Sequence, residues 1–205
     1  MGKRLAPRRA IFALILALAG CASTRVVHEW TSPDVASEHF RKFLVIAISK
    51  QPGIRRSFED EFVARLKAAG VDAVPSYGFI TEDGPVEEPR LREAVEKAGA
   101  DATLITRLVR VERKYSVDYG YYPPPMLGFG FYRGYSAAWV GYYEPAAVYP
   151  YDVYISETNL YDTARNQLIW SGTVETTPES ISKDIAHYVD TVIRALRARN
   201  LLAAR

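Results

Sequence analysis

Cys21 offers the clearest chemistry in this sequence, because it is the only cysteine among 205 residues and directly follows a distinctive N-terminal segment. The first nine residues carry four basic side chains, and an apolar run follows at 11–18. This order is typical of a secretory signal peptide. The run is shorter than the roughly 20 apolar residues that a transmembrane helix needs. We therefore expect residues 1–20 to be a signal peptide that ends beside the single thiol.

The four residues Leu18-Ala19-Gly20-Cys21 resemble the lipobox of bacterial lipoproteins. The resemblance implies cleavage before Cys21, attachment of diacylglycerol to its sulfur, and a protein that is tethered to a membrane without spanning it. In enteric-type lipoproteins an aspartate after the cysteine favours the inner membrane. Ala22 stands at that place here, which implies an outer-membrane address. An ordinary signal peptide or an uncleaved anchor with an incidental cysteine is the alternative.

The charge balance changes when residues 1–20 are removed. That segment holds four basic residues and no acidic ones, so the formal charge goes from +2 to −2. A nucleic-acid-binding protein usually carries a basic footprint, so we expect no nucleic-acid partner. Since Cys21 is the only cysteine, disulfides within the chain and zinc–thiolate sites are excluded. The remaining length is sufficient for one domain with a sizeable hydrophobic core.

Patterns for catalysis or metal binding are sparse in the rest of the sequence. It contains no serine-hydrolase elbow, metalloprotease helix, phosphate-binding glycine loop or calcium-binding loop. The histidines His28, His39 and His187 are scattered, and the spacing of Asp184 and His187 favours a surface pair on a helix. The acidic run 59–61 is flanked by arginines, which predicts a solvated helix face. We therefore expect no enzymatic activity, metal site or cofactor.

Hydrophobic periodicity predicts alternating strands and helices. Strands are expected at 43–48, 71–77, 102–118, 149–161 and 167–176, and helices at 54–69, at 91–98 and from Pro178 onward. Gly70 and Gly99 are expected to end the first two helices. Pro75 predicts that the second strand lies at an edge of the sheet or that its pairing ends early.

The order of these elements predicts a mixed sheet. A helix joins the first two strands, which favours parallel pairing between them. The last three strands follow one another and can form an antiparallel meander. Apolar residues at 26–30 are sufficient for a further short edge strand.

Several phrases of the sequence are similar to those of uncharacterised proteobacterial lipoproteins. They are Leu44-Val-Ile-Ala-Ile48, Arg55-Arg56-x-Phe58-Glu59-Asp60, Leu66-x-x-x-Gly70-Val71, Val74-Pro75-Ser76-Tyr77 and Gly99-Ala-Asp101-Ala-Thr-Leu104. With the element order and the lipobox, they resemble the small α/β envelope domains of the TolB N-terminal, LpoB and CsgG type over residues 26–118 and 148–202. The resemblance implies a periplasmic binding or assembly module. CsgG-like oligomerisation is a further possibility, although the sequence shows no amphipathic pore-forming strand pairs.

An aromatic insert at 119–150 departs from this pattern. Glycine and proline are interleaved with its aromatic residues, and Arg133 and Glu144 are its only charges. A loop of this length is uncommon in a compact domain unless it is functional or disordered. It could be a low-complexity loop, a partner-binding loop or a contact with lipid headgroups. Because tyrosine and tryptophan suit interfaces, our hypothesis is a partner-binding surface formed by Tyr121, Tyr122, Phe129, Phe131, Tyr132, Tyr135, Trp139, Tyr142 and Tyr143.

Together these features predict a bacterial envelope lipoprotein, lipid-anchored at Cys21, at the outer membrane and facing the periplasm. We expect residues 21–40 to be the lipidated tether. Residues 41–202 are expected to form one α/β domain, a mixed sheet of about five strands with helices packed on it. The predicted function is non-catalytic binding of an envelope protein, or envelope assembly. The alternative is a small-molecule binder or an enzyme with a cryptic site in the α/β domain.

Overall fold

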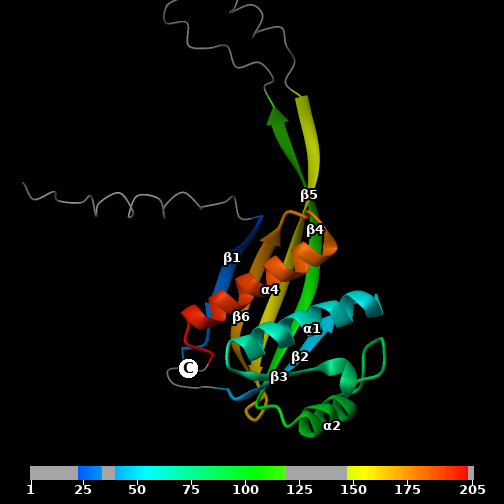
Figure 1. The fold of residues 1–205 in the computed structure, drawn as a ribbon, viewed down its shortest axis with the longest axis vertical. Helices are drawn as coiled ribbons and strands as arrows, with labels where there is room; N and C mark the ends of the chain where they lie inside the picture. Colours follow the sequence, from blue (N-terminus) through cyan, green and yellow to red (C-terminus); the bar gives the residue numbers. More distant parts are fainter. Residues whose placement is uncertain (1–22, 34–39, 119–146, 203–205) are drawn as a thin grey trace, which may run out of the picture.

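In the part of the chain that the structure describes, a six-stranded mixed sheet has three helices packed against it (Figure 1). The computed structural model describes residues 23–33, 40–118 and 147–202. The strands are β1 (Thr24–Thr31), β2 (Lys42–Ile48), β3 (Asp72–Pro75), β4 (Ala102–Asp118), β5 (Ala147–Asp162) and β6 (Gln167–Thr176). The helices are α1 (Pro52–Ala68), α2 (Glu88–Ala98) and α4 (Ile181–Ala198), with a short 3₁₀ helix η1 (Ser76–Gly78).

The strand order is β1-β6-β5-β4-β2-β3, and it confirms the predicted topology. β2 pairs in parallel with both β3 and β4, as the intervening helices require. β4, β5 and β6 form the predicted antiparallel meander. β1 adds the sixth strand as an antiparallel edge beside β6. β3 forms the other edge, and Pro75 is its last residue, where a missing N–H does least harm.

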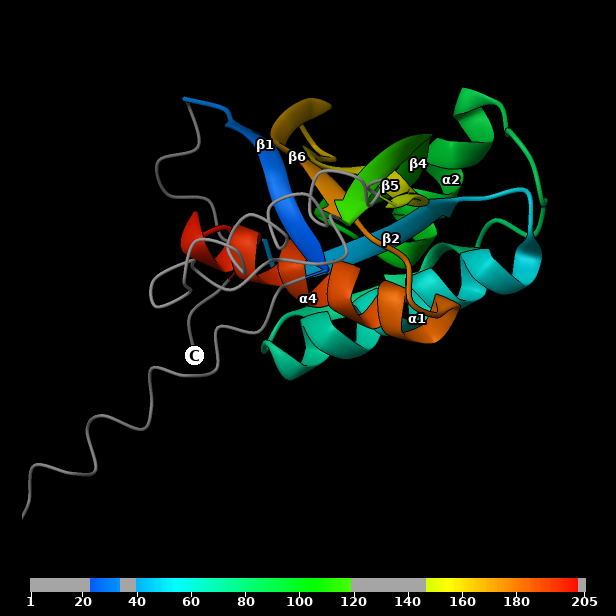
Figure 2. The same ribbon diagram turned by 90° about the horizontal axis from the view of Figure 1, so that it is seen from above.

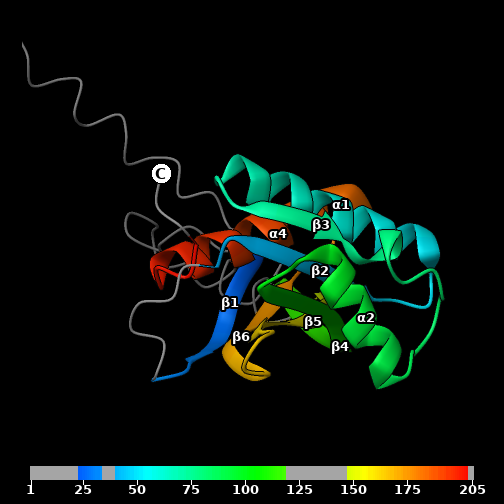
Figure 3. The same cartoon turned by 90° about the horizontal axis from the view of Figure 1, so that it is seen from below.

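Two layers of helices explain why β2 is apolar along nearly its whole length. α1 and α4 lie side by side on one face of the sheet and share a core with Phe43 and Val45 (Figure 2). α2 covers part of the opposite face, where Leu44 and Ile46 pack beneath it (Figure 3). Because successive side chains of a strand point to opposite faces, a strand covered on both faces needs a continuous apolar run.

Tyr188 of α4 lies at the centre of the larger core. Its ring makes edge-to-face contacts with Phe58 and Phe62 of α1, at centroid distances of 5.8 and 6.2 Å. Its hydroxyl forms hydrogen bonds with Thr106 and Thr158 at 2.9 and 2.6 Å. Burial raises the pKa of the Tyr188 hydroxyl to about 12. The hydroxyl therefore stays neutral and joins both helices to the centre of the sheet.

Two of the predicted helix boundaries agree with the structure, and one does not. Gly70 and Gly99 have positive φ angles of 89° and 61° directly after α1 and α2, as the predicted stops require. Pro178 does not begin α4, because the helix starts at Ile181 after Ser180. The Asp184 carboxylate accepts a hydrogen bond from the Glu179 N–H at 2.9 Å and so fixes the start of the helix.

Arg55 and Glu59 correct the prediction of a solvated acidic face. Both are buried, with relative exposures of 7% and 0%, and their side chains form an ion pair at 3.1 Å. The Glu59 carboxylate also accepts hydrogen bonds from the Ser76 hydroxyl at 2.7 Å and from the backbone N–H groups of Ala47 and Tyr77, each at 3.1 Å. A buried carboxylate thus satisfies backbone donors at the ends of β2 and β3.

The Arg55 guanidinium extends this network into the loop after η1. It donates to the Ser76 hydroxyl at 3.0 Å and to the carbonyl oxygens of Ile80 and Glu82 at 3.1 and 2.9 Å. We call Arg55, Glu59 and Ser76 the clamp. The prediction failed because the buried stripe of α1 continues from Leu66 and Phe62 to positions 59 and 55, so the two charged residues occupy core positions.

Replacing Glu59 with alanine is expected to lower the free energy of unfolding by about 3–5 kcal/mol, because Arg55 is left buried without its partner. Urea denaturation of the mature chain measures the change. Glu61→Ala is the matched control on the same helix, since Glu61 pairs with a half-exposed Arg65 at 2.8 Å. Its expected cost is about 1 kcal/mol or less. An equal decrease in the free energy of unfolding in the two variants would contradict the stabilising role of the clamp.

Candidate functional site

The most distinctive surface of the molecule is a two-stranded projection of the sheet. β4 and β5 have 17 and 16 residues, whereas β2 has 7 and β6 has 10. β2 pairs with β4 only as far as Arg107, and β6 pairs with β5 only from Tyr154 onward. Residues 112–118 and 147–153 therefore pair with each other alone, and together with residues 108–111 of β4 we call them the ribbon. Figure 1 shows the ribbon extending well beyond the other strands and the helices.

A register shift marks the point where the ribbon leaves the sheet. It lies between Leu108 and Arg110 of β4, just after the last residue that pairs with β2. An extra residue in one strand bends the pair and increases its local twist. The shift thus turns β4 and β5 away from the sheet at the position where their neighbours end.

One face of the ribbon, the side on which α1 and α4 lie, is predominantly apolar. Cross-strand pairs on this face join Val111 to Tyr154 and Val117 to Val148. An ion pair between Arg113 and Asp152 at 3.3 Å interrupts the face once. Its large hydrophobic side chains are exposed: Leu108, Val111, Tyr115, Val117, Val148 and Tyr154. Exposed apolar surface of this kind is a candidate interaction site.

The opposite face of the ribbon is held to the sheet by charge. Lys114 and Arg25 both pair with Glu175 of β6, at 3.2 and 2.9 Å. Hydrogen bonds from Arg25, and secondarily from Lys114, hold the pKa of the Glu175 carboxyl below its usual range. Tyr149 and Tyr151 are exposed farther along this face. The ion-pair network therefore joins β1, β6 and the ribbon at the ribbon's base.

The apolar face continues into a groove at the base of the ribbon. This groove has a volume of about 370 Å³ and lies between the N-terminal turns of α1 and α4. Ile48, Ile54 and Ile181 line it together with Leu108 and Val111, so groove and ribbon share residues. Ile48 and Ile181 are both largely exposed. The groove and the ribbon thus form one extended apolar surface.

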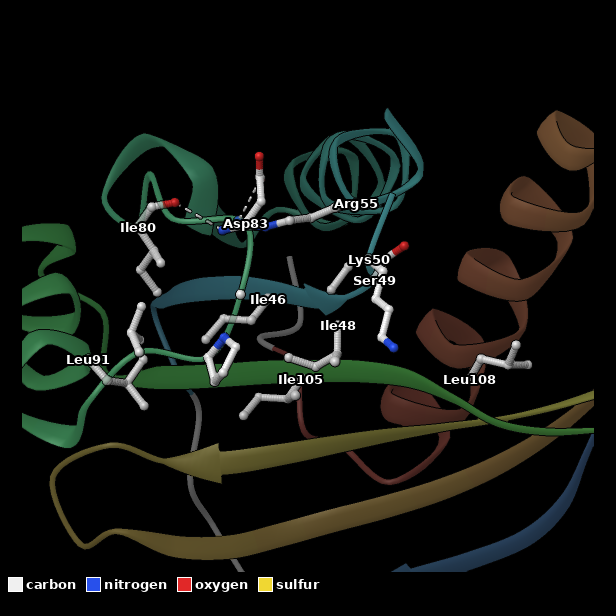
Figure 4. A pocket seen from close by; sticks show the side chains of 14 residues that line it. Ile46, Ile48, Ser49, Lys50, Arg55, Ile80, Asp83, Leu91, Ile105 and Leu108 are labelled. Carbon is white, nitrogen blue, oxygen red and sulfur yellow. Dashed lines mark hydrogen bonds and ion pairs between the residues drawn. The ribbon is translucent and has the colours of Figure 1, made fainter. Parts of the chain in front are cut away.

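A second cleft, of about 730 Å³, lies at the carboxyl end of β2 beside the middle of β4, and it shares Ile48 and Leu108 with the groove (Figure 4). Most of its lining is aliphatic, and Lys50, Arg55 and Asp83 supply its charged groups. Arg55 is committed to the clamp and also lies 3.6 Å from Asp83. Arg55 therefore holds the loop after η1 in place. Across the described ranges, no three metal-ligating side chains come together.

The residues predicted for the site from the sequence lie outside the described ranges. They are Cys21 and the nine aromatic residues of the insert between Tyr121 and Tyr143. The insert is shorter than the predicted range 119–150, because Ala147–Pro150 pair with Tyr115–Asp118 and belong to β5. Asp118 and Ala147 are themselves paired, so the chain enters and leaves the insert at the far end of the ribbon.

Sequence analysis missed the apolar face of the ribbon. The periodicity along 102–118 and 149–161 predicts two strands, but it does not show where their neighbours in the sheet end. A signal was available in the strand lengths, since two long strands beside a seven-residue strand must extend beyond it. Of the histidines, His28 and His187 are exposed on β1 and α4, and His39 lies outside the described ranges. The sequence predicts a surface pair of Asp184 with His187. In the structure, the Asp184 carboxylate accepts a hydrogen bond from the Glu179 N–H.

Similarity to known proteins is remote. No protein-family model and no curated protein matches the chain. Among solved structures, the PelC dodecamer of Paraburkholderia phytofirmans is similar at 15% identity and a TM-score of 0.48, over 89% of this chain and 99% of that one. Lipoprotein GNA1162 of Neisseria meningitidis is similar at 14% identity and a TM-score of 0.41, over 77% and 99%. At such scores these similarities carry no argument about binding or assembly. Among the described helices, none is both long and apolar enough to cross a bilayer.

The Glu175 network predicts a pH-dependent contribution to stability. Because the pKa of Glu175 is lowered in the folded state, its stabilising contribution is present above the unfolded-state value of about 4.5. It is lost as the pH falls through the lower, folded-state pKa. Wild type should therefore be more stable than Glu175→Gln at pH 7, by about 1 kcal/mol or less, and the difference should vanish in acid. Urea denaturation between pH 7 and pH 3 measures it.

Glu179→Gln provides the matched control, since Glu179 pairs only with the exposed Lys183 at 3.5 Å. We expect it to change stability little at any of these pH values. A Glu175→Gln difference that persists unchanged in acid would show that the carboxylate charge does not hold the ribbon's base.

Proposed function

We propose that this protein is a lipid-anchored bacterial envelope protein that works as a non-catalytic module for protein binding or envelope assembly. The ribbon and the insert at its end are its contact surface. Cys21 carries the lipid, and the domain faces the periplasm from the outer membrane. The observation that carries the proposal is the ribbon, because it presents exposed aromatic and aliphatic side chains that the fold itself leaves uncovered.

The chemistry of the ribbon supports a contact surface. Tyrosine buries a large area at low entropic cost and keeps a polar tip, which is why interfaces are enriched in it. Four tyrosines of the ribbon and its border are exposed: Tyr115, Tyr149, Tyr151 and Tyr154. The insert that follows Asp118 adds further aromatic residues and only two charges. The exposed side chains of the ribbon and the composition of the insert are therefore both rich in aromatic residues, and both favour an interface.

A small-molecule binder or an enzyme is the second candidate, and the cleft favours it. Ligands of open α/β sheets bind beyond the carboxyl ends of the strands, and this cleft lies at the carboxyl end of β2. Its aliphatic lining would suit an apolar ligand. The clamp engages the Arg55 guanidinium, so the cleft has few groups with which to orient a polar substrate. We therefore place the contact surface on the ribbon.

Cys21→Ser tests the anchor. The variant is expected to lose lipidation, because serine has no sulfur for the thioether. Mass spectrometry of the N-terminal peptide measures the loss. Ala22→Ser is the control and should remain lipidated. A wild-type N-terminal peptide that carries no lipid, or a Cys21→Ser peptide that still carries one, would contradict the proposed anchor.

Photo-crosslinking in living cells tests the contact surface. A photoreactive residue at Trp139 of the insert is expected to yield one dominant protein adduct, which mass spectrometry then identifies. The matched control is the same substitution at Trp30, an exposed tryptophan on β1. Adducts from both positions in equal yield, or none from Trp139, would argue against a partner-binding insert and direct attention to the cleft.

A further inference from the structure

The described fold begins almost at the lipidation site, and the following inference rests on the proposed lipidation of Cys21. The Ser23 carbonyl accepts a hydrogen bond from the Thr177 N–H at 2.8 Å, and Thr24 pairs with Thr176. Three residue steps separate Cys21 from Thr24. A fully extended chain covers at most about 3.6 Å per residue, so the Cys21 Cα lies within roughly 11 Å of the Thr24 Cα. The anchor is therefore close to the sheet.

The ribbon extends from the same end of the sheet as the anchor. β1 and β5 are both antiparallel to β6, so the first residue of β1 points in the direction of the ribbon (Figure 1). Thr24 of β1 and Tyr154 of β5 both pair with Thr176 of β6, so the three residues lie at the same level across the sheet. Residues 147–153 of β5 extend beyond this level, which is about 23 Å of extended strand. The ribbon therefore reaches roughly twice as far as the tether can.

The end of the ribbon has the composition of a surface that contacts lipid headgroups. We call residues 115–118 and 147–151 the ribbon tip. Asp118 is its only charged residue. Tyr115 and Tyr149 are 64% and 58% exposed, and Val117 and Val148 lie beside them and are also exposed. Tyrosine favours the interfacial layer of a bilayer, where its ring is apolar and its hydroxyl stays hydrated.

Apart from Asp118, the charges of the ribbon lie nearer the sheet than the tip does. Arg113 pairs with Asp152, and Lys114 pairs with Glu175, directly below the tip. The opposite arrangement occurs along β1, the other surface close to the anchor. There, Arg25 is exposed and an Arg199–Glu29 ion pair at 3.0 Å borders the strand. Contact with lipid through the tip therefore desolvates fewer charges than contact through the β1 edge.

We propose that the ribbon tip seats in the headgroup layer of the same leaflet that holds the Cys21 lipid, and that the base of the ribbon, its groove and the insert serve the protein partner. The protein then has two membrane contacts, one covalent and one formed by aromatic and aliphatic side chains of β4 and β5. Because the ribbon reaches farther than the tether, the two contacts place the strands obliquely to the membrane, with α2 at the distant end.

Fluorescent labelling of the lipidated, mature chain tests this orientation. Val117→Cys and Tyr149→Cys place an environment-sensitive label on the two opposite faces of the tip. Ala164→Cys places it on the exposed turn after β5, at the other end of that strand. Since lipidation converts the Cys21 thiol to a thioether, each variant has one free thiol. The proteins are reconstituted in phosphatidylcholine vesicles, and each label is quenched with aqueous iodide or with a nitroxide lipid spin-labelled near the headgroup.

Both tip labels are expected to show blue-shifted emission, quenching by the nitroxide lipid and protection from iodide. The Ala164 label should show the reverse. Tip labels as accessible to iodide as the Ala164 label, on a chain whose lipid is confirmed by mass spectrometry, would overturn the inference and leave the proposed anchor intact. Protection from both quenchers would mean that a protein, such as a second copy of the chain, covers the tip, and would also overturn it. A free Cys21 thiol would overturn the anchor and the inference together.

Discussion

The pairing of β4 with β5 is the constraint on which the candidate site depends. The two strands stay paired from Ala102 with Asp162 to Asp118 with Ala147, with one register shift, although β2 and β6 end much earlier. An isolated two-stranded hairpin is marginally stable in water. Here the hairpin grows out of a six-stranded sheet, so its base is already ordered, and the Glu175 network joins it to two further strands. The exposed aromatic and aliphatic side chains can therefore be presented at a distance from the domain.

The clamp gives the domain a second fixed region at the carboxyl end of β2. Burial of an arginine and a glutamate is expensive, and it is tolerated only where hydrogen bonds satisfy both groups. Glu59 reaches backbone donors of two separate segments, and Arg55 reaches carbonyl oxygens of a third. Of the charged residues that border the cleft beside the clamp, Arg55 and Asp83 are therefore already engaged. The cleft has few free polar groups, whereas the ribbon exposes aromatic and aliphatic side chains. This difference favours our proposal of a protein-binding module over a catalytic one.

Much of the fold could be predicted from the sequence, because apolar periodicity and helix-stopping glycines depend on neighbouring residues. The parallel βαβ unit, the antiparallel meander and the edge position of Pro75 all follow from such local patterns. The clamp could not be predicted in this way, since the spacing of Arg55 and Glu59 is equally typical of an exposed pair, and their burial depends on η1 and β2. The ribbon depends on where the neighbours of β4 and β5 stop pairing. Cys21 and the insert residues lie outside the described ranges, so their roles stay predictions.

The central claim is that the ribbon is a rigid extension of the sheet, and a distance measurement across β5 tests it most directly. Spin labels at Tyr149→Cys and Ala164→Cys in the same lipidated chain lie at opposite ends of this strand. An extended strand of that length separates them by about 45 Å. Pulsed electron paramagnetic resonance should give a narrow distance distribution near this value. A broad distribution that reaches much shorter distances would show that the ribbon is not held as an extension of the sheet, and would contradict the account.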